Sequence, residues 1–268
     1  MRGSWRLIPG VVLLGVPLLA AVFGPLLVTR GGSKDTASTT GNGHLLGTDY
    51  AGADVLNEVL LGGRTVVLVA AAATVCLYLA AVPIGVLAGM TRRRMLDELL
   101  MRPLDIALAI PSMLMLLLLA SMAPGTMWLL IAVVALINLP DVIRICRASA
   151  LSISARPAVE AMRLQGEGWW RIAIGFVTRS MIRTVLTDAG TRFTGAIYLV
   201  ASASFLGVGV SPQTSDWAAM VDRNRVGLFV QPWAVLVPAG LIIALVVGIN
   251  LLFDQTLTRR DRHGEPAR

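Results

Sequence analysis

The chain has 268 residues, of which 56% are hydrophobic, and its mean hydropathy is +0.74. This composition excludes a water-soluble domain, and the length leaves no room for a separate enzyme domain beside many membrane spans. The formal net charge of +7 is spread over loops between apolar stretches, which suits anionic lipid headgroups better than nucleic acid. We therefore expect one integral membrane domain over 1–268, in contact with membrane lipids and with no nucleic acid.

Six apolar stretches approach the roughly 20 residues that a helix needs to cross a bilayer. The first follows a basic start and resembles a signal peptide, but it is long and lacks a clear cleavage site, so we expect an uncleaved anchor. The fold class predicted is therefore an all-α membrane protein with six transmembrane helices. The stretches are Leu7–Val28, Val66–Gly89, Ile106–Met122, Met127–Leu139, Phe193–Val210 and Trp233–Phe253.

The third and fourth stretches are separated only by Ala123–Thr126, which contains Pro124 and Gly125. Proline and glycine together predict a tight turn at this point. The fourth helix is expected to continue past Leu139 to the membrane surface, with Pro140 either kinking it or ending it.

Basic residues orient the bundle, because short cytoplasmic loops carry an excess of Lys and Arg. Most of the 23 Lys and Arg fall on the cytosolic side if both termini are cytosolic. Residues 142–192 then form a cytosolic loop and 211–232 an external loop. Residues 29–65 form an external linker and pre-span segment, in which Gly31–Gly43 has the Gly, Ser and Thr content of a flexible linker.

The external loop is long enough for a small helical cap, with Trp217 and Trp233 at the membrane surface. Its charged side chains could contact an external partner, or they could simply be solvated. They are Asp216, Asp222, Arg223 and Arg225.

The chain lacks the residues of an energy-converting site. Its one lysine, Lys34, stands in the expected external linker, so no phosphate-binding loop of the GxxxxGK[ST] type exists. His44 and His263 lie at opposite ends and cannot form a zinc site together. No ionisable residue is expected at the centre of a span, which disfavours coupling to an ion gradient. We expect a chain that is not an enzyme and holds no cofactor or metal, driven by another subunit.

Between Val142 and Arg192, apolar residues return every three or four positions, as on an amphipathic helix. Ser154–Pro157 interrupts this pattern. Pro157 can begin a new helix, Glu160 falls early in it, and Gly166 or Gly168 can end it. The pattern predicts a short helix lying across the cytosolic face.

The segment EAMRLQG, Glu160–Gly166, resembles the EAA motif of ABC-importer permeases, whose pattern is Glu, Ala, Ala, three variable residues and Gly. Met162 replaces the second Ala of that pattern. Three further segments are similar to the second, C-type permease of dipeptide, oligopeptide and nickel importers. They are His44–Thr65, Met90–Ser112 and Ser202–Val221.

The resemblance implies a type I permease architecture in a bacterial inner membrane. It also implies a heterodimer with a second permease, cytosolic subunits that bind ATP and Mg, and an external substrate-binding protein. The short helix would dock on the ATPase and transmit its closure. The residues implied in this coupling are Glu160, Ala161, Met162, Arg163, Gly166 and Glu167.

Alternatives remain open at this point. The short helix could rest on lipid, with Trp169 and Trp170 as interfacial anchors. The cargo of the same architecture could be nickel, haem or glutathione instead of peptides. A membrane scaffold is a further possibility, although no span carries a clustered nucleophile, base or metal set.

The fifth stretch carries small and polar residues that could face a translocation path. Thr194, Tyr198 and Ser202 repeat every four residues and so share one helix face. The same residue types also mediate close packing between membrane helices, which leaves two readings. The residues predicted for the path are Thr194, Tyr198, Ser202 and Ser204.

Overall fold

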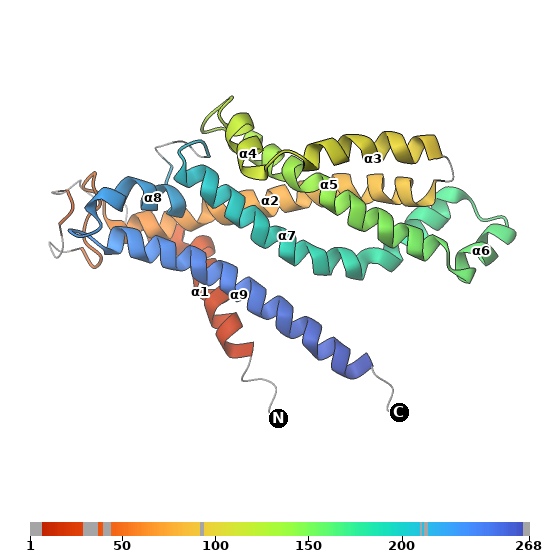
Figure 1. Ribbon diagram of the computed structural model, residues 1–268. Helices are drawn as coiled ribbons and strands as arrows, with labels where there is room; N and C mark the ends of the chain where they lie inside the picture. Colours follow the sequence, from red (N-terminus) through yellow and green to blue (C-terminus); the bar gives the residue numbers. More distant parts are fainter. Residues whose placement is uncertain are drawn as a thin grey trace. The chain divides into compact units, whose positions relative to one another are not determined.

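The structure is a computed structural model that describes residues 7–28, 37–39, 44–91, 94–209, 211 and 214–264. In these residues the regular structure is helical, apart from one isolated bridge between Thr48 and Asp54. The chain divides into two compact units (Figure 1). The terminal unit comprises Met1–Ala70, Ala120–Leu130 and Ile197–Arg268, and the central unit comprises Ala71–Leu119 and Ile131–Ala196.

Among the residues described, four helices are long and apolar enough to cross a membrane. A pair of helices with a sharp bend between them would be a fifth candidate if the pair is counted as one span. The four are α1 (Leu7–Leu27), α2 (Val55–Met90), α5 (Met127–Ser154) and α9 (Trp233–Gly264). They contain the expected first, second, fourth and sixth stretches. The expected linker Gly31–Gly43 lies largely outside the described residues.

The third stretch does not form one continuous helix, so that expectation was wrong. The chain forms α3 (Arg94–Leu108) and α4 (Ser112–Ala120), whose axes are bent by 89° at the break between them. Pro111 stands at this break. Proline lacks a backbone N–H and disfavours the helical conformation of the residue before it, here Ile110, which explains the interruption.

The tight turn before α5 is confirmed. Gly125 has a φ of +77°, and the Thr126 N–H donates to the Ala123 carbonyl oxygen at 3.3 Å. The helix that follows passes through Pro140 and ends at Ser154. Of the two outcomes expected at Pro140, termination does not occur, although the proline removes one hydrogen bond from the helix.

Residues 193–205 of the fifth stretch belong to a longer helix, α7 (Arg179–Phe205), whereas residues 206–209 form a turn and Val210 lies outside the described residues. This helix is not among those apolar enough to be assigned as spans by composition. Its N-terminal half carries Arg183, Asp188 and Arg192, whose charges lower its hydropathy. Of these side chains Arg183 is exposed, whereas Asp188 and Arg192 are half-buried.

The terminal unit is held together by close helix approaches. A Cβ on Gly24 of α1 would lie 2.1 Å from the Leu60 carbonyl oxygen, and one on Gly248 of α9 would lie 2.5 Å from the backbone nitrogen of Leu14. Only glycine allows backbones this near one another.

The external loop forms the expected helical cap, with α8 (Trp217–Asn224) followed by a short 3-10 helix (Arg225–Gly227). Trp217 is fully buried, and its Nε1–H donates to the Val59 carbonyl oxygen at 2.7 Å. Its side chain therefore packs inside the terminal unit instead of lying exposed at a surface. Gly62 and Gly63 leave the space that the indole fills, since a Cβ on Gly63 would lie 2.3 Å from Trp217 Cζ2.

The central unit packs the second half of α2 against α5. Gly85 and Gly89 face Cys146 and Ala150, and the added Cβ atoms would approach these side chains to 2.4 and 2.7 Å. Cys146 is buried in the core and Cys76 is exposed, and both are free thiols. This core also includes Val159, through which α6 (Pro157–Leu164) is attached to the unit.

Candidate functional site

The predicted short helix is present as α6, and its ends follow from its sequence. Arg156 is extended, with φ −72° and ψ 144°, and Pro157 occupies the first turn, where its missing N–H is harmless. At the other end Gly166 has a φ of +81°, its N–H donates to the Arg163 carbonyl oxygen at 3.1 Å, and the Glu167 N–H donates to that of Met162 at 3.1 Å. These two bonds form a Schellman motif, which requires a residue like glycine at position 166.

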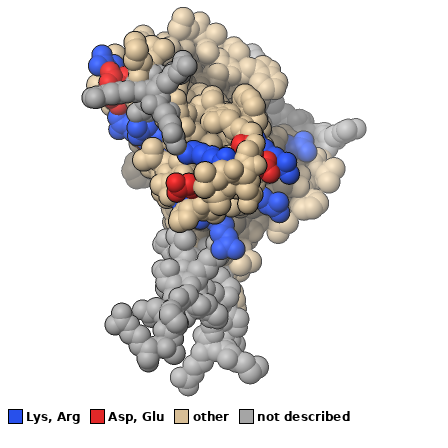
Figure 2. Space-filling view, turned by 90° about the vertical axis from the view of Figure 1, so that its right-hand side faces the viewer, with Lys and Arg blue, Asp and Glu red and all other residues tan. Residues whose placement is uncertain are grey.

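One side of α6 is anchored and the other is open. Val159 is fully buried in the core of the central unit, and Met162 packs partly against it. The remaining side chains of the helix are exposed, and Leu164 is 85% exposed. Figure 2, which faces the side on which α6 lies in Figure 1, shows basic and acidic side chains gathered around this end.

The predicted coupling residues therefore differ in accessibility. Glu160, Ala161, Arg163 and Gly166 are exposed, whereas Met162 and Glu167 are half-buried. Glu167 forms an ion pair with Arg171, with 3.2 Å between Oε2 and Nη1. Leu164 was not singled out from the sequence, because the leucine looks like a core residue until the register of Val159 is known.

Two unusual features connect α6 to α7. Trp169 and Trp170 make an edge-to-face pair with ring centroids 4.8 Å apart, and Trp170 is 68% exposed. A π-helix follows at Arg171–Thr178, in which the Thr178 hydroxyl donates to the Ala173 carbonyl oxygen at 2.9 Å. Helices of this kind are rare and are frequently found at functional sites. The path from α6 to α7 thus runs through a non-standard helix.

A polar network in the central unit joins three helices. The Tyr78 hydroxyl on α2 donates to Asp188 Oδ2 on α7 at 2.5 Å. Arg192 Nη1 donates to Asp141 Oδ2 on α5 at 3.0 Å, and Arg192 Nε lies 3.6 Å from Asp188 Oδ1. Arg144 of α5 is also paired with Asp105 of α3.

This network was missed from the sequence, where no ionisable residue was expected at the centre of a span. Arg192 lies near the middle of α7. The spacing of Asp188 and Arg192, four residues apart on a helix, was the available signal, because residues at that spacing are neighbours on the helix surface.

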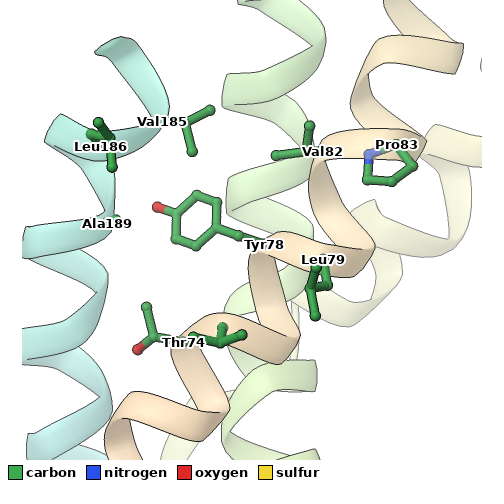
Figure 3. Close-up of a pocket in the computed structure, with 9 residues that line it drawn as sticks. Thr74, Tyr78, Leu79, Val82, Pro83, Val185, Leu186 and Ala189 are labelled. Atoms are coloured by element: carbon green, nitrogen blue, oxygen red, sulfur yellow. The ribbon is translucent and has the colours of Figure 1, made fainter. Parts of the chain in front are cut away.

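Two cavities flank this network within the central unit. The first, of about 480 Å³, is apolar and lies between α2 and α7 (Figure 3). Figure 3 shows the Tyr78 ring extending across it from α2 toward α7. The second cavity, of about 510 Å³, is lined by two charged side chains, three threonines and one isoleucine. They are Ile145, Arg183, Thr184, Thr187, Asp188 and Thr191. Tyr78 connects the two, because its ring lines the first and its hydroxyl binds a carboxylate that lines the second.

The four residues predicted for a translocation path lie at different depths. Thr194 is half-buried and its hydroxyl donates to the Gly190 carbonyl oxygen of its own helix at 3.2 Å. Tyr198 is 59% exposed and Ser202 is half-buried. Ser204 is buried at 4% exposure. Of these four residues, Tyr198 therefore has the most exposed side chain and is the most accessible to a ligand.

The charged residues of the external loop also differ from one another. Asp216 is fully buried and caps α8, accepting from the Ala218 and Ala219 N–H groups through Oδ1. It therefore cannot serve as an exposed docking charge. Burial raises the pKa of this carboxyl to about 6, with the nearby Ser204 hydroxyl acting in the opposite direction. Ser204 Oγ and Asp216 Oδ2 nevertheless do not reach hydrogen-bonding geometry and have no partner among the residues described. Asp222 and Arg225 form a partly exposed ion pair.

Comparison with known proteins adds an independent finding. Residues 81–260, which include α5, α6 and α7, match the family described as binding-protein-dependent transport system inner membrane component. The chain is 34% identical over 211 residues to the di/tripeptide transport system permease protein DppC of Pseudomonas aeruginosa, over 78% of this chain and 69% of that protein.

Two further relatives match over more of the chain. One is the probable D,D-dipeptide transport system permease protein DdpC of Escherichia coli, 26% identical over 260 residues, 95% of this chain and 86% of that protein. The other is the dipeptide transport system permease protein DppC of Alkalihalophilus pseudofirmus, 29% identical over 252 residues, with shares of 92% and 82%.

Proposed function

Because the chain belongs to the family of binding-protein-dependent transport system inner membrane components, we propose that it is a permease subunit of an ATP-driven importer for dipeptides or oligopeptides. It crosses the inner membrane of a bacterium six times, with both termini in the cytosol. It forms the translocation path as a heterodimer with a second permease. Cytosolic partner subunits bind ATP and Mg, an external binding protein delivers the peptide, and this chain is not catalytic itself.

The exposed side of α6 is the observation that carries this proposal. A helix that is fixed to its unit through Val159 and leaves Glu160, Arg163 and Leu164 open is suited to docking in a groove of another protein. The residues assigned to the docking are Glu160, Ala161, Met162, Arg163, Gly166 and Glu167.

The conformational change of the ATPase is then transmitted from α6 to α7. Closure of the ATPases on ATP moves α6, and the π-helix at Arg171–Thr178 carries this displacement into α7, which turns the path from inward to outward opening. Hydrolysis resets it. The paired permeases are the bistable element, and the two coupled sites are the ATP interface and the external mouth of the path. Thr194, Tyr198, Ser202 and Ser204 are assigned to the path itself.

The test uses two variants of α6 in the complete importer reconstituted in liposomes. Gly166→Pro cannot adopt the φ of +81°, and Glu160→Lys reverses a charge on the open side without touching the core. Both are expected to abolish uptake of a labelled dipeptide and to uncouple ATP hydrolysis from it, while the chain still inserts.

Gly168→Ala is the matched control, because an added Cβ there meets nothing within 4 Å and its φ is not positive. It should leave uptake unchanged. Normal uptake by both Gly166→Pro and Glu160→Lys would rule out coupling through α6.

A further inference from the structure

The second cavity, lined mainly by α7, brings together the side chains that a site for a small zwitterion needs. Its lining contains one cation, Arg183, one anion, Asp188, and three threonine hydroxyls, with Ile145 of α5 as the apolar member. Arg183 is exposed and makes no ion pair among the residues that the structure describes. A cavity of about 510 Å³ is in the size range of small-molecule pockets.

The order of these groups around the helix separates the two charges. At about 100° per residue, Thr187, Thr191 and Thr184 fall between Arg183 and Asp188 around the axis of α7. The hydroxyls therefore occupy the middle of the cavity and opposite charges occupy its two sides. Hydroxyl groups both donate and accept, which suits the amide groups of a peptide.

The spacing along the helix also fits a short peptide. Arg183 and Asp188 are five residues apart, which corresponds to about 7.5 Å along the axis at about 1.5 Å per residue. An extended dipeptide spans about 7 Å, at roughly 3.3–3.6 Å per residue. The amino and carboxylate ends of a dipeptide or tripeptide can thus meet the two charged side chains at once.

The network behind the cavity favours a cation at Asp188. Tyr78 and Arg192, neither of which lines this cavity, hold the carboxylate in place. Arg192 is shared with Asp141, so that these three ionised side chains together carry one net negative charge. A substrate ammonium group would neutralise that charge, and a carboxylate can accept several hydrogen bonds at once.

We propose that this cavity is a peptide subsite at the cytosolic end of the translocation path, where Asp188 binds the free amino end of a short peptide and Arg183 binds its free carboxylate. This inference rests on the proposed function and adds to it the groups of the cargo that the permease itself recognises. The threonine hydroxyls bind the peptide backbone between the two ends.

The test is a cycle that changes the protein and the peptide separately. Uptake of a dipeptide with free ends and of the same dipeptide with an acetylated amino end is measured in liposomes that contain the complete importer, at saturating binding protein. The wild-type importer and Asp188→Asn are compared with both peptides. The binding protein is the same in all four measurements. Its preference for one peptide over the other therefore cancels when the loss of uptake caused by Asp188→Asn is compared between the two peptides.

Asp188→Asn should lower uptake of the free dipeptide about tenfold or more, the scale expected for a lost hydrogen bond between charged groups, and should leave uptake of the acetylated dipeptide unchanged. Arg183→Gln is an exposed change that leaves the network intact. It should lower uptake of a dipeptide with a free carboxylate and leave uptake of the same dipeptide with an amidated carboxyl end unchanged. Arg179→Gln is the matched control, because it removes an exposed charge four residues before Arg183 on α7. It should cause the same small change in uptake for all of the peptides.

Equal losses for free and blocked peptides in both variants would overturn the subsite. Equal losses accompanied by reduced co-purification of the second permease would instead identify the cavity as a contact between permeases. A wild-type importer that assembles and hydrolyses ATP but transports neither peptide would contradict the proposed function itself. Failure of the subsite and failure of the proposed function therefore give different results.

Discussion

Arg192 of α7 donates a hydrogen bond from Nη1 to Oδ2 of Asp141 on α5, 3.0 Å away. The same guanidinium lies 3.6 Å from Asp188 through Nε, so one cation serves two carboxylates on two helices. The position of the Arg192 side chain therefore helps to fix the register of α7 against α5.

Removal of this cation should destabilise the central unit. Arg192→Gln leaves Asp141 and Asp188 without their shared partner, and since Asp141 is 45% exposed we expect a loss of only about 1–2 kcal/mol, below that for a fully buried pair. Thermal or denaturant unfolding of the purified chain measures this loss. In a double-mutant cycle, Asp141→Asn combined with Arg192→Gln should cost less than the sum of the single changes. Strict additivity would show that the pair contributes nothing.

Close packing around Trp217 gives a second prediction. In Gly63→Ala the new methyl group would lie 2.3 Å from Trp217 Cζ2, so the indole must shift and the change should cost about 1–3 kcal/mol. Unfolding followed by tryptophan fluorescence reports both the loss and the displaced ring. Gly240→Ala on α9 is the control, because nothing lies within 4 Å of its added Cβ and alanine favours a helix.

The buried carboxyl of Asp216 predicts a dependence of stability on pH. Burial raises its pKa from 3.8 to about 6, although the N–H groups of Ala219 and Ala218 act in the opposite direction. A group whose pKa is higher in the folded state binds its proton more tightly there, so its stabilising contribution is full below about pH 4 and is lost as the pH rises through about 6.

The measurement is the unfolding temperature of the purified chain between pH 4.5 and 7. The wild type should lose about 2 kcal/mol over this range from Asp216, since each tenfold change in proton affinity corresponds to about 1.4 kcal/mol. Asp216→Asn keeps the helix cap and has no titrating group, so its stability should vary less with pH. Parallel curves for the two proteins would contradict the assignment.

Leu164 gives a prediction about assembly. This side chain is 85% exposed at the end of α6, and its burial in a partner groove would remove apolar surface from water. Leu164→Ala should weaken binding of the ATP-binding subunit by about 1–2 kcal/mol, or roughly tenfold in Kd, without lowering the stability of the chain alone. Unchanged affinity in a titration of the purified partners would exclude this residue from the interface.

Local signals in the sequence were sufficient to predict α6. Pro157 and Gly166 act within one turn of their own positions, so the start of the helix was predicted without tertiary information, and its end was narrowed to Gly166 or Gly168, of which Gly166 has the positive φ. The break at Pro111 was missed because a continuous apolar run gives the same signal whether or not the helix is interrupted.

Contacts between distant residues could not be inferred in the same way. The partners of Asp188 and Arg192 depend on the register of α7 against α2 and α5, which no single segment encodes. Trp217 likewise resembles an interfacial tryptophan until the glycines at 62 and 63, far away in sequence, provide the space that it fills. Composition suggested the membrane class, but not which polar side chains meet.

Docking of α6 on an ATP-binding subunit is tested most directly by site-specific photo-crosslinking in native membranes. A benzoylphenylalanine at Ala161, on the exposed side of α6, should form an adduct with the ATP-binding subunit, whereas the same group at Phe229, 98% exposed in the external loop, should not. Adducts from Ala161 to lipid alone, with none to an ATPase in membranes that transport peptide, would contradict the account and place α6 on the bilayer surface.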